Sequence, residues 1–198
     1  MKALKIFGIV IGSIIGLVII VGVIFWILLS RPSGIASKVT PVPSNSQAAQ
    51  SLDTKWNNFA DAVVQSPPGT PHTLTLTQEE VNSKVNEELK TLVLPAGLGV
   101  SNVNVNLTNG KILLSADVTY SVFSGNAGME ATVETNNGQA SISVTNIDMG
   151  ALPIPQSVKD QLKGLIPEDI LMQGSDTAFY TQNVQIENGQ VVITGVTQ

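Results

Sequence analysis

The chain has 198 residues, a formal net charge of -5 and a charged fraction of 13%, about half that of an average soluble domain. It is too apolar for a disordered protein, and its acidic balance argues against nucleic acid as a partner. The absence of cysteine excludes disulfides, a thiol nucleophile and a thiolate zinc site. The length allows one ordinary domain with a small addition.

The apolar residues are concentrated near the N-terminus. From Ile6 to Leu29 there are 24 residues without a charge. As a helix of about 36 Å this run is long enough to cross a hydrocarbon core of about 30 Å. Arg31 follows it, as a charge often follows a membrane span. The sequence therefore predicts that residues 1–31 are an uncleaved signal anchor, a single-pass transmembrane helix.

A cleaved signal peptide is the alternative, because residues 34–36 form a small-x-small site. The apolar part of a signal peptide usually has only about 7–15 residues, which favours the anchor. Residues 32–198 carry 7 basic and 15 acidic side chains and are rich in neutral polar residues, as exported domains often are. We therefore expect a cell-membrane protein with a cytoplasmic N-terminus and its body outside.

Three glycines in the apolar run follow a G-x-x-x-G pattern: Gly8, Gly12 and Gly16. Such a stripe lets two membrane helices approach closely, so it is a candidate surface for a homodimer. The alternative is that glycine is simply common in membrane helices.

The segment after the run, residues 32–45, contains Pro32, Pro41 and Pro43 among small polar residues. This composition predicts a semi-extended linker. Residues 46–198 then form the extracytoplasmic domain.

Two amphipathic helices are predicted in the first part of this domain. The first begins near Ser46 and ends before Pro67, with an apolar stripe at Leu52, Trp56, Phe59 and Val63. A short strand over residues 73–77 leads into the second, where Thr77 and Glu80 form a capping box. Its apolar stripe is Val81, Val85, Leu89 and Leu92, and ion pairs among Glu80, Lys84 and Glu88 are expected on the opposite side.

The hydrophobic period then changes from 3.6 to 2. Four antiparallel strands are predicted around residues 103–107, 112–122, 129–133 and 140–144, with turns at 109–110, 124–128 and 136–138. A further helix is predicted over residues 155–167 and a closing hairpin around Asn188–Gly189. The fold class is therefore α+β: a curved antiparallel meander wrapped around amphipathic helices.

No catalytic, metal or cofactor site is predicted. The single histidine, His72, is expected in a loop without a nucleophile or second ligand nearby. The neighbouring glutamates at 79–80 and 87–88 diverge by about 100° on a helix and do not form an acid–base pair. Phosphate-binding motifs are absent from the sequence. We therefore expect a protein that is not an enzyme and needs no cofactor.

A row of asparagines, Asn102, Asn104 and Asn106, alternates with the apolar residues of the first meander strand. Asparagine is depleted in strands, so the row calls for an explanation. Two are open: a solvated sheet face, or a neutral polar surface for cell-wall sugar.

Four short motifs carry a family resemblance: residues 75–82, 103–112, 150–155 and 184–195. Their order resembles that of the YpmS-like and LmeA-like groups of bacterial membrane-anchored, extracytoplasmic proteins, which look related to the tubular lipid-binding superfamily. The resemblance spans roughly residues 50–198. It implies a long helix lying in a strongly curved sheet, with an apolar interior that holds lipid and no catalytic signature.

The first functional hypothesis is therefore a membrane-tethered, lipid-binding protein. Its groove would be lined by the second helix and the second meander strand, at Val81, Val85, Leu89, Ile112, Leu114 and Val118. The second hypothesis is an envelope scaffold or a protein- or polysaccharide-interaction domain without a bound ligand. Periodicity alone does not distinguish a lipid groove from a filled core.

Overall fold

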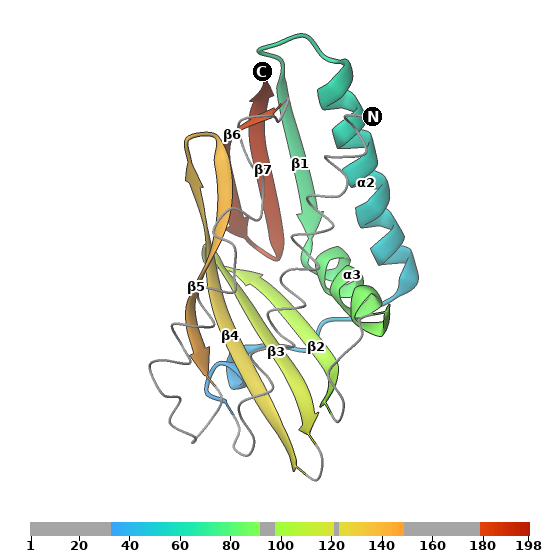
Figure 1. Ribbon diagram of the computed structural model, residues 1–198, viewed down its shortest axis with the longest axis vertical. Helices are drawn as coiled ribbons and strands as arrows, with labels where there is room; N and C mark the ends of the chain where they lie inside the picture. Colours follow the sequence, from blue (N-terminus) through green and yellow to red (C-terminus); the bar gives the residue numbers. More distant parts are fainter. Residues whose placement is uncertain (1–32, 92–97, 121–122, 149–178) are drawn as a thin grey trace.

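The computed structural model describes residues 33–91, 98–120, 123–148 and 179–198, which form two antiparallel sheets and two α-helices (Figure 1). The class is α+β, as predicted. The elements are η1 (Ala36–Lys38), α2 (Ser46–Gln65), β1 (Pro71–Thr77), α3 (Gln78–Thr91), β2 (Leu98–Thr108), β3 (Lys111–Tyr120), β4 (Phe123–Asn136), β5 (Gln139–Asp148), β6 (Phe179–Glu187) and β7 (Gln190–Thr197).

Helix α2 covers one face of the smaller sheet. Asn45 caps it, because the Ala48 N–H donates to the Asn45 side-chain oxygen at 2.8 Å. The predicted stripe is confirmed, and it packs against β1 and β6. This core consists of Leu52, Trp56, Phe59, Val63, Leu74, Leu76 and Phe179.

The smaller sheet has the strand order β1-β7-β6. The hairpin of β6 and β7 was expected, but its pairing with β1 was not. Pro71 lies opposite Val196 and Thr77 opposite Gln190, so more than a hundred residues separate the partners in sequence. This pairing joins a strand from the first part of the domain to the last strand of the chain.

The larger sheet has the order β2-β3-β4-β5 and confirms the predicted four-stranded meander. One predicted turn was wrong, because residues 124–128 lie inside β4. The β3–β4 pairing ends instead at Tyr120 and Phe123. Gly128, predicted to lie in that turn, is in the strand, and a Cβ there would lie 2.6 Å from the backbone nitrogen of Ala36. Glycine in this strand therefore permits a close approach of the N-terminal segment.

Three Asn-Gly turns have the backbone expected of type I′ hairpins, with asparagine φ near 50° and glycine φ of 75–79°. They also connect the two sheets. The Gly110 N–H donates to the Ile186 carbonyl at 2.8 Å, and the Gly189 N–H donates to the Leu107 carbonyl at 3.0 Å. The hairpin corners thus fix the end-to-end arrangement of the sheets that is visible in Figure 1.

Several predictions lie outside the described residues: the membrane span over residues 6–29, its glycines Gly8, Gly12 and Gly16, and the helix over residues 155–167. Within the described ranges, no helix has the length and apolar character needed to cross a membrane.

Candidate functional site

Residues 33–45, which we call the docked segment, lie on the polar face of the larger sheet. Ser33 and Ile35 are buried, with 1% and 4% of their surface exposed. The Ile35 N–H donates to an Asp148 carboxylate oxygen at 3.1 Å. The segment predicted as a linker is therefore attached to the domain from its first described residue.

The asparagine row binds the backbone of this segment. The Asn106 side-chain oxygen accepts from the Thr40 N–H at 2.7 Å, and the Asn106 amide nitrogen donates to the Thr40 carbonyl at 3.0 Å. Asn104 accepts from the Val42 N–H at 2.9 Å. The Asn106 side chain thus replaces the peptide group of a neighbouring strand, and Asn104 supplies one acceptor to the segment. At these two positions the explanation of a solvated face was wrong, because the side chains bind the docked segment.

The third asparagine of the row has a different role. The Asn102 amide nitrogen donates to an Asp117 carboxylate oxygen at 2.6 Å. Asn102 has a positive φ of 51° and lies where the β2–β3 register shifts. It therefore supports a β-bulge, a position that asparagine tolerates better than most residues.

Helix α3 secures the end of the docked segment. The Asn82 amide nitrogen donates to the Val42 carbonyl at 3.0 Å, and the Asn45 N–H donates to the Ser83 hydroxyl oxygen at 3.1 Å. Asn82 is 1% exposed. The docked segment is consequently held between the sheet and α3.

The same helix also protects the edge strand β2. Side-chain oxygens of Gln78 and Asn82 accept from the Leu107 and Val105 N–H groups at 2.7 and 3.0 Å. One turn further, the Asn86 amide nitrogen donates to the Val103 carbonyl at 2.9 Å. Four helical residues rise about 6 Å and two strand residues about 6.7 Å, so the two periods match. An open sheet edge is thereby satisfied.

The predicted groove residues lie on α3 and β3, but the main contacts of α3 are with α2, β2 and β1 rather than with β3. Val85 and Leu114 are each 1% exposed, and Ile112 is also buried. Val81 packs against the core under α2, and Leu89 is half-buried. Val118 lies in β3, but its side chain is outside the described part of the structure.

The apolar face of the larger sheet extends well beyond these residues. It continues across β4 and β5, and the main contacts of α2 and α3 lie elsewhere, with β1, with β2 and with each other. Its buried members are Val105, Leu107, Ile112, Leu114, Ala116, Ala127, Met129, Ala131, Ala140, Ile142 and Val144.

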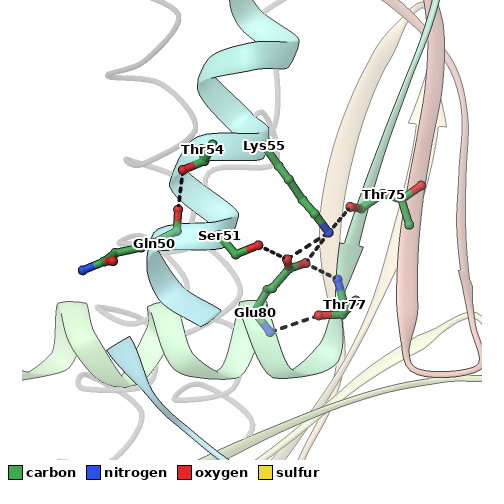
Figure 2. A network of polar contacts seen from close by, with 7 residues as sticks. All are labelled: Gln50, Ser51, Thr54, Lys55, Thr75, Thr77 and Glu80. Carbon is green, nitrogen blue, oxygen red and sulfur yellow. Dashed lines mark hydrogen bonds and ion pairs between the residues drawn. The ribbon is translucent and has the colours of Figure 1, made fainter. Parts of the chain in front are cut away.

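A polar network joins α2, β1 and α3 around the buried carboxylate of Glu80 (Figure 2). The predicted capping box is confirmed, because the Glu80 N–H donates to Thr77 Oγ1 at 3.2 Å and the Thr77 N–H donates to Glu80 Oε2 at 2.8 Å. Ser51 also donates to this carboxylate at 2.6 Å, and Lys55 pairs with it at 2.9 Å. The network therefore fixes the angle between the two helices.

The ion pairs on the α2-facing side of α3 differ from the predicted ones. Lys84 pairs with Asp53 at 2.9 Å and with Glu88 at 3.0 Å, whereas Glu80 pairs with Lys55. The expected Glu80–Lys84 pair was therefore wrong, because each of the two side chains pairs with a residue of α2 instead. Only the Lys84–Glu88 pair of the prediction is present.

These contacts shift two pKa values. Burial alone raises the pKa of the Glu80 carboxyl, but hydrogen bonds from Ser51, the Thr77 backbone and Lys55 lower it below its ordinary value. Burial alone lowers the pKa of the Lys84 ammonium, but Asp53 and Glu88 raise it above its ordinary value. Both groups are therefore stabilised in their charged forms.

His72 lies in β1, opposite Gly195, rather than in a loop. Its ring stands edge-on to Phe59, with the ring centroids 6.3 Å apart. Among the described residues, its Nε2 atom has no hydrogen-bond partner. A shallow depression of about 480 Å³ lies beside it, lined by Lys55, Asn58, Phe59, Ala62, His72, Thr73, Leu74 and Thr75.

Over the described ranges, no group of three histidine or acidic side chains is placed to hold a metal ion. In the comparisons with known proteins, no family model, no curated protein and no solved structure matches the chain.

Proposed function

We propose that this chain is a membrane-tethered, extracytoplasmic lipid-binding protein without catalytic activity. The apolar run over residues 6–29 supports the membrane anchor. The resemblance of the motifs in residues 75–195 to YpmS-like and LmeA-like proteins supports the lipid ligand. In this proposal an acyl chain lies against the apolar face of the larger sheet.

The observation that carries the proposal is the extent of that apolar face. It runs across four strands, whereas α2 packs on the smaller sheet and α3 lies along β2. A sheet face of this composition needs an apolar cover, and its members are buried, at 9% exposure or less. In this proposal an acyl chain forms part of that cover, since ligand sites are lined mainly by hydrophobic side chains.

A fluorescence titration of residues 33–198 with a polyene fatty acid tests the ligand. These residues include the whole docked segment, so its contacts with the sheet are retained. We expect saturable binding. Ala131→Met enlarges a fully buried side chain at the centre of the face and should weaken the binding.

Ala62→Met, at an exposed position on α2, serves as the matched control and should bind as the unmodified protein does. In a filled core, Ala131→Met would instead lower the stability by overpacking, and the unmodified protein would bind no fatty acid. That pair of results would reject the lipid-binding proposal.

A further inference from the structure

The point where the chain enters the domain lies on the polar face of the larger sheet. Ser33 is buried, and its hydroxyl accepts hydrogen bonds from the Ile35 and Ala36 N–H groups at 3.1 Å. Leu29, the last residue of the apolar run, precedes Ser33 by only four residues. A chain of four residues spans at most about 14 Å. The surface around Ser33 is therefore tied close to whatever holds the apolar run.

We propose that the polar face of the larger sheet around η1 is the surface of this protein nearest to the lipid bilayer, and that the docked segment holds it there. The inference rests on the proposed membrane anchor. The partner is the layer of lipid headgroups of the bilayer that the apolar run crosses.

Because the segment is docked on the sheet, the proposed anchor restricts the orientation of the domain as well as its position. A free linker of 13 residues would have a root-mean-square span of about 20 Å and would let the domain rotate. Here Asp148, Asn106 and Asn104 bind the segment to the sheet, and Asn82 binds its end to α3. The docked segment is therefore not a free linker between Ser33 and the rest of the domain.

The far end of the domain is well separated from η1. Helix α2 begins where the docked segment ends, and its 20 residues extend for about 30 Å. Figure 1 shows the turn that follows α2 at the opposite end of the molecule from η1. Pro68 in that turn is exposed. It provides a reference position for a distance measurement.

The test uses the full chain in phosphatidylcholine vesicles that contain an acceptor dye on the lipid headgroups. Because the chain has no cysteine, a donor dye can be placed on one introduced cysteine. Asn146→Cys places it on an exposed position of the polar face, on the strand that ends at Asp148, and Pro68→Cys places it at the far end. We expect energy transfer to be several-fold stronger from position 146.

Combining Asn104→Ala with Asn106→Ala should reduce the transfer from position 146 toward that from position 68, because the segment loses the side chains that bind its middle part to β2. Combining Asn57→Ala with Asn58→Ala, on the exposed surface of α2, should not. Equal or stronger transfer from position 68 in the unmodified background would overturn the proposed orientation. Flotation with the vesicles tests the anchor separately, since a chain that does not float with them contradicts the proposed function itself.

Discussion

The side chain of Asn106 binds both backbone groups of Thr40, accepting from its N–H at 2.7 Å and donating to its carbonyl at 3.0 Å. An asparagine amide carries one acceptor and two donor positions, so it satisfies a peptide group as a neighbouring strand would. Through this pair the segment that leaves the predicted membrane anchor becomes part of the domain.

Asn106→Ala should lower the free energy of unfolding by about 1–3 kcal/mol, because the Thr40 N–H and carbonyl lose their partners. Urea denaturation of residues 33–198 measures this value. Asn57→Ala removes an asparagine from the exposed surface of α2 and should change the value by less than about 0.5 kcal/mol. Similar losses in the two variants would argue against a structural role for the row.

Gly128→Ala should displace η1 from the sheet. The new Cβ would lie 2.6 Å from both the Ala36 backbone nitrogen and the Ile35 Cβ, at a cost of about 1–3 kcal/mol. Amide hydrogen exchange at Ile35 should therefore accelerate. Unchanged exchange at Ile35 in Gly128→Ala would contradict the close contact.

Asn82 should act on two elements through different atoms. Asn82→Ala should accelerate amide exchange at Val105 and also loosen the docked segment, because its oxygen accepts from Val105 and its nitrogen donates to Val42. Asn82→Asp keeps the acceptor but removes the donor. It should preserve the slow exchange at Val105 while loosening the segment, and equal exchange at Val105 in the two variants would refute this division.

Glu80 should contribute a pH-dependent part of the stability. Its pKa in the folded protein lies below the unfolded value of about 4.3, so this part is fully present above pH 4.3 and is lost as the pH falls through the folded pKa. Glu80→Gln should remove about 1–3 kcal/mol at neutral pH and flatten the loss of stability in acid.

Denaturation curves at several pH values between neutral and strongly acidic conditions measure this dependence. Glu87→Gln, at an exposed position on the same helix, is the control and should retain the pH dependence of the unmodified protein. An unchanged acid profile in Glu80→Gln would show that the buried network does not depend on the charge of this carboxylate.

Local patterns predicted the local structure well. The stripe from Leu52 to Val63 defined α2, the pairing of Thr77 with Glu80 placed the start of α3, and the Asn-Gly turns placed three hairpins. In each case the interacting residues are close in sequence, so spacing alone carries the information.

Long-range contacts decided what the sequence did not show. The polar side chains at 104 and 106 can form hydrogen bonds with water or with a docked backbone equally well. The alternating pattern therefore did not predict that they bind residues 40–42. One pattern in the sequence does indicate a long-range contact. Gln78, Asn82 and Asn86 repeat every four residues, a period that matches every second residue of a strand and pairs them with β2.

Native mass spectrometry of the full chain, extracted gently from membranes, tests the lipid-binding proposal most directly. We predict a population of the protein that carries the additional mass of one acyl lipid, reduced by Ala131→Met and unaffected by Ala62→Met. A bare protein mass in every preparation, with both variants indistinguishable from the unmodified chain, would contradict the proposal.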